Sequence, residues 1–164
     1  AETQKGLGQV YFQQSNWDKA IEYYKMYNSA NSVDAKSHFF LAQAYKEKGN
    51  LPEAEKSYQA ATRIDPKFSD AFFNYGNLLL ELKKFGAAIS AYKSAIANDK
   101  SLPKAYYNLA LAYSNDQKYD EALQAFKDFV KVGEGKPALK GLVQQVKTKT
   151  IPELQDAIDK ADQQ

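Results

Sequence analysis

The sequence lacks cysteine and is poor in arginine and histidine. Its 164 residues contain no cysteine, and Arg63 is the one arginine. Without cysteine the chain forms neither disulfides nor thiolate-based catalytic or metal sites. The net charge is only +2, which gives no strong attraction to nucleic acid or to an acidic membrane surface. Because arginine is favoured for bidentate contacts to bases, its scarcity also argues against a nucleic-acid partner.

The sequence also lacks a long hydrophobic run. No stretch of 18 apolar residues occurs, so no membrane span is predicted. The absence of cysteine is compatible with both the cytosol and the bacterial envelope. The composition therefore predicts a soluble chain without choosing its compartment.

Signatures of catalysis are missing as well. There is no glycine-rich phosphate loop, no HExxH sequence and no nucleophile elbow. The acids Glu47, Glu53, Glu55 and Asp65 do not form a cluster with metal-ligand spacing. The one histidine, His38, is expected to be a core or half-buried residue rather than a ligand or base. We therefore predict no enzyme activity, no catalytic residues, no metal and no cofactor.

What the chain does contain is a pattern with a period of 34 residues, most complete over residues 35–68. Small residues recur at the eighth and twentieth positions of each unit, and an aromatic residue recurs at the twenty-fourth. The three columns are Gly8, Ala42, Gly76 and Ala110; Ala20, Ala54, Ala88 and Ala122; and Tyr24, Tyr58, Tyr92 and Phe126. Ordinary helical patterning does not place small residues in register four times, so the period predicts a stacked repeat architecture.

Each unit is predicted to be a hairpin of two helices. Its apolar positions follow helical spacing in two runs, separated by turn residues such as Gly49 and Asn50. Pro52 suits the first turn of the second helix, where its missing N–H is not needed. The small residues at the eighth and twentieth positions allow the two helices to approach closely.

This repeat resembles the tetratricopeptide repeat (TPR) family. The family has Gly or Ala at position 8, Ala at 20 and 27, an aromatic residue at 24 and Pro at 32. Residues 35–68 match it at Leu41, Ala42, Tyr45, Ala54, Tyr58, Ala61 and Pro66. The resemblance covers residues 1–136. It departs at Tyr27 and Phe129, where the family prefers Ala, and at Ser32, Lys100 and Glu134, where it prefers Pro. It implies an all-α fold, a right-handed α-solenoid of four TPR-like helix hairpins with C-terminal capping helices.

The predicted repeats span residues 1–34, 35–68, 69–102 and 103–136. Residues 137–164 are predicted to form C-terminal capping helices, because a stacked repeat must cover its last apolar face. One helix is expected over 138–149 and a second up to about 161. The first is basic and the second is acidic, so the two are expected to pair antiparallel. A docking helix for another protein is the alternative.

The resemblance also indicates a binding surface, because first helices line the concave face of TPR arcs. The fifth position carries Phe39, Phe73 and Tyr107, which we predict to be an exposed apolar stripe. Neighbouring amide side chains can both donate to and accept from a peptide backbone. The predicted peptide-binding groove consists of Phe39, Gln43, Phe73, Asn74, Asn77, Lys104, Tyr107, Asn108 and Leu111. In the alternative, the three aromatics pack along the stack.

Some TPR proteins hold a partner's C-terminal carboxylate in a clamp of Lys, Asn and Arg. Aligned on the second to fourth units, this chain matches the clamp only at Asn74 and Lys104. Aligned on the first three units, it matches only at Lys5. We therefore expect an apolar or mixed protein or peptide ligand rather than a terminal carboxylate.

Together these features predict a non-catalytic protein–protein interaction module, an adaptor or scaffold. One alternative is a self-associating scaffold, a homo-oligomer in which Tyr27 and Phe129 mark the contacts. The other is a regulatory or substrate-recruiting region of a larger enzyme. Because the chain begins with Ala1, inside a repeat, we expect it to be a trimmed or processed part of a longer protein.

Overall fold

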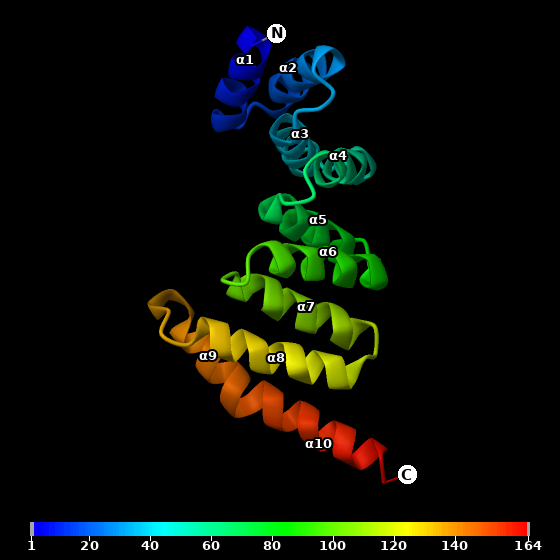
Figure 1. Ribbon diagram of the computed structural model, residues 1–164, viewed down its shortest axis with the longest axis vertical. Helices are drawn as coiled ribbons and strands as arrows, with labels where there is room; N and C mark the ends of the chain where they lie inside the picture. Colours follow the sequence, from blue (N-terminus) through cyan, green and yellow to red (C-terminus); the bar gives the residue numbers. More distant parts are fainter. Residues whose placement is uncertain (1, 164) are drawn as a thin grey trace. The chain divides into compact units, whose positions relative to one another are not determined.

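The computed structural model describes residues 2–163, and all regular secondary structure in that part of the chain is helical (Figure 1). The predicted all-α fold is confirmed. The chain divides into two compact units, residues 1–78 and residues 79–164, here called the N-terminal and C-terminal units. No helix among the described residues has the length and apolar character needed to cross a bilayer.

The N-terminal unit consists of successive helix hairpins. Its helices are α1 (Glu2–Gln13), α2 (Trp17–Ala30), α3 (Ala35–Glu47), α4 (Leu51–Ile64) and the greater part of α5 (Ser69–Glu81). Asn16, Asp34 and Asn50 cap α2, α3 and α4, since each side chain accepts a hydrogen bond from the backbone N–H three residues later, over 3.1 to 3.4 Å. Two of these helices lie within each of the predicted repeats 1–34 and 35–68.

The C-terminal unit continues the same hairpin pattern. After the end of α5 it contains α6 (Phe85–Asn98), α7 (Pro103–Asn115) and α8 (Tyr119–Gly133), then η1 (Pro137–Leu139), α9 (Lys140–Gln145), η2 (Val146–Thr150) and α10 (Ile151–Ala161). Both α9 and α10 contact α8. A cap formed by residues 137–164 would make such contacts, and this role stays a prediction.

The turn inside each hairpin has a left-handed residue at one repeat position. Ser15, Gly49, Lys83 and Gln117 have φ angles of 55°, 75°, 58° and 60°. In each case the next residue donates its N–H to the carbonyl five residues earlier, over 2.8 to 2.9 Å. This 6→1 bond is the Schellman ending of a helix. Glycine adopts positive φ without strain, yet only Gly49 is a glycine among these four residues; the other three carry side chains.

The small and aromatic columns form the core. The alanines at the twentieth position of all four units, Ala20, Ala54, Ala88 and Ala122, are completely buried. The aromatic rings at the twenty-fourth position are buried as well. At the eighth position, a Cβ on Gly8 would lie 3.1 Å from the ring of Tyr24, so α1 and α2 approach as closely as glycine permits.

Tyr27 and Phe129 stand where the family prefers Ala, and the self-association hypothesis expected them to mark contacts between copies. The structure places both inside their own units. Tyr27 is 4% exposed and donates its hydroxyl to Asp34 over 3.0 Å. Phe129 is fully buried, with its ring centroid 5.2 Å from that of Tyr107. Each large ring fills space inside its own unit, so neither is available to a second copy.

The predicted antiparallel pair of C-terminal helices is wrong. Residues 140–161 instead form one nearly continuous helical segment, because the residues that join α9, η2 and α10 keep right-handed helical angles. The sequence prediction placed a break at Pro152, because proline has no N–H to donate and its ring clashes with the carbonyl four residues back. The helix accommodates Pro152 locally and does not end there. The chain widens by one residue there, and Ile151 donates its N–H to the carbonyl of Val146.

Candidate functional site

A small hollow in the N-terminal unit brings together residues from successive hairpins. Its volume is about 180 Å³, and its lining consists of Phe12, Trp17, Gln43, Lys46, Glu47, Tyr58 and Asn74. Helices α1, α3 and α5 are the first helices of their hairpins, and they supply five of these residues. The hollow thus lies along the helices that the family resemblance predicts to line a binding face.

The wall of the hollow includes a buried phenol. Tyr58 is 1% exposed, and its ring packs 6.0 Å from that of Phe39 and 6.2 Å from that of Tyr75. Within residues 2–163 its hydroxyl makes no hydrogen bond to the protein, yet no fully buried side-chain oxygen or nitrogen there lacks a partner. The hydroxyl of Tyr58 therefore opens onto the hollow. Burial, and secondarily the charge of Glu47, raises the pKa of Tyr58, so the hydroxyl stays protonated and can donate.

Two amides line the same hollow as Tyr58. Asn74 donates from Nδ2 to the carbonyl of Asp70 over 2.8 Å, which leaves its Oδ1 as an acceptor. The half-buried Gln43 makes no side-chain hydrogen bond to the protein within residues 2–163. The hollow therefore offers a hydroxyl donor, an amide acceptor and a complete amide group, which together match the donors and acceptors of a peptide backbone.

The repeat-equivalent pair in the C-terminal unit is closed. There Tyr92 and Asn108 occupy the positions that Tyr58 and Asn74 occupy one repeat earlier, and their side chains are hydrogen-bonded to each other. Burial raises the pKa of Tyr92, and the bond from Asn108 partly offsets this rise. The same residue pair is thus satisfied internally in one unit and left open in the other.

The expected exposed stripe is wrong for Phe39. Its side chain is 8% exposed, and its ring lies between 5.0 and 6.0 Å from the rings of Phe40, Tyr58 and Phe68. Tyr107 is half-buried, with its ring 5.8 Å from Phe126 and 5.2 Å from Phe129. At these two positions the aromatic packs against the second helix of its own hairpin, whereas the alternative interpretation expected packing along the stack against neighbouring first helices. Phe73 is half-buried on α5.

The other predicted groove residues are divided between the two units. In the N-terminal unit Gln43 and Asn74 share the hollow, and Asn77 is half-buried on α5. In the C-terminal unit Lys104 is exposed, whereas Asn108 and Leu111 are half-buried, all on α7.

Sequence reasoning missed several residues that line the hollow. Phe12 and Lys46 occupy the twelfth position of their units, on the first helices that the family resemblance places along the concave face, so a signal for them existed. Tyr58 belongs to a column that we interpreted only as packing. Its buried ring fits that interpretation, but whether its hydroxyl has a hydrogen-bond partner depends on the rotamers of its neighbours, which the sequence does not specify.

Lys5, one of the two lysines that matched the carboxylate clamp, has an internal partner. Lys5 Nζ lies 2.6 Å from Asp34 Oδ2, which also accepts from the Tyr27 hydroxyl. Burial alone would raise the pKa of Asp34, but the hydrogen bonds from Lys5, Ser37 N–H and Tyr27 outweigh it and lower that pKa. Lys5 therefore anchors the start of α3 rather than a ligand.

His38 is half-buried, as predicted. Its Nδ1 lies 3.4 Å from Asn28 Nδ2, and its Nε2 lies 3.2 Å from the carbonyl oxygen of Ser32. Because the amide nitrogen donates to Nδ1, the ring proton belongs on Nε2. Both nitrogens are thus used in holding the α2–α3 connection. The described residues contain no group of three or more His, Asp or Glu placed to hold a metal ion.

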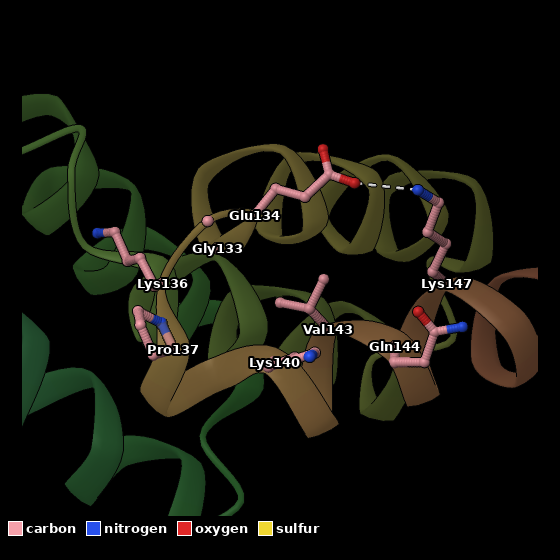
Figure 2. A pocket seen from close by; sticks show the side chains of 9 residues that line it. Gly133, Glu134, Lys136, Pro137, Lys140, Val143, Gln144 and Lys147 are labelled. Atoms are coloured by element: carbon pink, nitrogen blue, oxygen red, sulfur yellow. Dashed lines mark hydrogen bonds and ion pairs between the residues drawn. The ribbon is translucent and has the colours of Figure 1, made fainter.

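A second hollow, of about 460 Å³, lies at the turn between α8 and α9 in the C-terminal unit (Figure 2). Lys136, Lys140 and Lys147 line it together with Glu134 and Val143. Lys147 is 3.0 Å from Glu134, and Lys136 donates to the carbonyl of Ser101 over 2.9 Å. Two of the three cations thus have partners within the unit, which makes this hollow a weaker candidate for a binding site.

Comparison with known proteins agrees with the repeat. The tetratricopeptide repeat family matches residues 39–103 and 73–137, which together cover more than half of the chain. The chain therefore belongs to the tetratricopeptide repeat family.

Individual relatives are distant. Hsp70-Hsp90 organizing protein 3 of Arabidopsis thaliana is 24% identical over 89 residues, and the match covers 54% of this chain but only 16% of that protein. A solved structure of MamA from Desulfovibrio magneticus is 18% identical with a TM-score of 0.76, covering 99% of this chain and 93% of that one. The type III secretion chaperone SycD of Yersinia enterocolitica, in complex with a peptide of the translocator YopD, is 20% identical with a TM-score of 0.66, covering 73% of this chain and 91% of that one. These structures establish the fold.

Proposed function

We propose that the chain is a non-catalytic protein-interaction module, an adaptor or scaffold, that binds an extended segment of a partner protein across the hollow of the N-terminal unit. The observation that carries the proposal concerns Tyr58, whose side chain is 1% exposed. Its hydroxyl lacks a protein partner within residues 2–163, and the residue lines the hollow together with Gln43 and Asn74. The relation to a chaperone solved with a bound peptide supports the same kind of ligand.

The size and chemistry of the hollow restrict the ligand. At about 180 Å³ it is smaller than the roughly 300–1,000 Å³ of small-molecule sites, so it suits one part of a longer ligand. Phe12 and Trp17 supply apolar surface, while Lys46 and Glu47 bring opposite charges. A peptide segment with both apolar and polar side chains fits this lining better than the anionic C-terminus of a peptide.

The test uses a peptide selected from a random displayed library on the intact chain, with affinity then measured by calorimetry. Tyr58→Phe keeps the ring and removes only the hydroxyl, and Gln43→Ala removes the free amide. Gln59→Ala is the matched control, since Gln59 is exposed on α4 and does not line the hollow. A lost hydrogen bond of about 0.5–1.5 kcal/mol predicts affinity weaker by roughly twofold to tenfold for each of the first two variants.

Gln59→Ala should bind as the unchanged chain does. Equal affinity for all four proteins would move the site away from the hollow and refute the proposal. Replacing Phe39 is not a suitable test, because its buried ring contributes to the core.

A further inference from the structure

The C-terminal unit has an unfilled apolar groove between α8 and α10. Its volume is about 630 Å³, within the range of ligand-binding sites. Figure 1 shows α10 diverging from α8 toward its C-terminal end. The floor is formed by the apolar face of α10, where Leu154, Ala157, Ile158 and Ala161 follow helical spacing.

The packing of α10 is incomplete on this face. Although the helix is amphipathic, none of its residues is buried. Across the groove Tyr119, in the first turn of α8, is 48% exposed and is among the few large apolar side chains exposed to that extent. A contiguous exposed apolar surface framed by polar residues is characteristic of an interaction site.

The rim of the groove is acidic. Asp120 and Glu121 lie on the α8 side and Asp162 follows α10. The one lysine in the lining, Lys118, is paired with Asp116 over 2.8 Å. Three carboxylates and one lysine thus leave a net negative charge around the apolar floor of the groove.

We infer that this groove binds a cationic amphipathic helix of a partner protein. A third helix packs naturally between two diverging helices, with apolar side chains at every third or fourth position entering the groove. Lysine or arginine side chains beside that stripe would face Asp120, Glu121 and Asp162. The charge of the rim selects this ligand over an acidic helix, and the site is independent of the hollow in the N-terminal unit.

The probe is a synthetic helix of about 15 residues with leucine at every third or fourth position among lysine and alanine. Its binding to the intact chain is measured by fluorescence anisotropy at physiological salt and located by amide chemical shifts in NMR. Two control peptides are used: a scrambled peptide of the same composition, and a peptide with glutamate in place of lysine. We expect saturable binding of the first peptide alone, with shifts at Tyr119 and Ile158.

The charge test is a pair of matched double variants. Asp120→Lys with Glu121→Lys reverses the rim, and Glu22→Lys with Asp156→Lys makes the same change in net charge at exposed positions outside the groove. The rim variant should bind on the order of tenfold more weakly and the control within about twofold.

Several results would overturn the inference. These are equal binding of the scrambled or acidic peptide, shifts confined to residues outside the groove, or no saturable binding. Sedimentation showing a dimer that the rim reversal dissociates would assign the groove to a second copy instead.

Discussion

Two glycines in α1 provide a direct test of how closely the first two helices approach. Gly6 and Gly8 are both inside the helix, yet their surroundings differ. A Cβ on Gly6 would have no atom within 4 Å, whereas one on Gly8 would lie 3.1 Å from two atoms of the Tyr24 ring. That ring is 1% exposed and stacks on Phe40 with 6.0 Å between centroids, so it has little room to move.

The expected magnitudes follow from these surroundings. Gly6→Ala should raise the free energy of unfolding by up to about 1 kcal/mol, because alanine is the better helix former. Gly8→Ala has the same helical advantage but overpacks the core, which costs about 1–3 kcal/mol. Its net effect should lie between neutral and a loss of about 2 kcal/mol. The free energies of unfolding of the two variants should therefore differ by about 1–3 kcal/mol, with Gly6→Ala the more stable.

Urea unfolding followed by tryptophan fluorescence is the suitable assay. Trp17 is the one tryptophan, and its ring lies 5.3 Å from that of Phe12 in the N-terminal unit, so it reports on the unit that contains both glycines. Equal stabilisation by Gly6→Ala and Gly8→Ala would refute the close approach of α1 and α2. A loss with both would mean instead that α1 contributes little stability as a helix.

Three further predictions concern turns, charge and the C-terminal helix. Gly49→Ala should lower the free energy of unfolding by about 1 kcal/mol; because a Cβ there meets no atom within 4 Å, the cost comes only from the φ of +75°. Gln117→Gly should raise the free energy of unfolding by up to about 1 kcal/mol, because φ there is 60°. Urea unfolding measures both effects. The pKa of Asp34 is lower in the folded state than in the unfolded state. The carboxylate therefore contributes its full stability above the unfolded pKa of about 4, and this stability is lost as the pH falls through the folded pKa. Asp34→Asn should accordingly flatten the acid side of the curve of stability against pH. Pro152→Ala restores an N–H to the helix, and amide hydrogen exchange over Val146–Thr150 should slow; unchanged exchange would mean that the proline does not cause the widened turn.

The repeat was predictable because its signal is internal. Small residues that recur at a fixed spacing have one physical use, the close approach of two helices, and Ala20 and Ala54 serve it as expected. The turn position was visible only in part: Gly49 is recognisable from its type, but Ser15 and Lys83 have no preference for positive φ. Their conformation follows from the geometry of the hairpin and not from local propensity.

The errors have a common origin in side-chain direction. Phe39 was expected to be exposed because the family places its position on the concave face, yet its ring turns toward Tyr58 and Phe68. Leu142 and Leu154 lie in segments whose amphipathic patterns predicted two helices and a break between them. The helical pattern does continue, and one proline only widens it locally. Periodicity therefore identifies which residues are helical more securely than it identifies where each side chain points.

The same limit explains why the candidate site required the structure. An aromatic ring at the twenty-fourth position satisfies packing without a hydroxyl, as Phe126 does, so the oxygen of a tyrosine there needs a separate explanation. In Tyr92 that explanation is Asn108, the amide from the next repeat. The equivalent amide beside Tyr58 is that of Asn74, which turns to the carbonyl of Asp70 instead. The Tyr58 hydroxyl opens onto the hollow and has no protein partner within residues 2–163, so it remains able to donate a hydrogen bond to a group that enters the hollow, such as a peptide carbonyl.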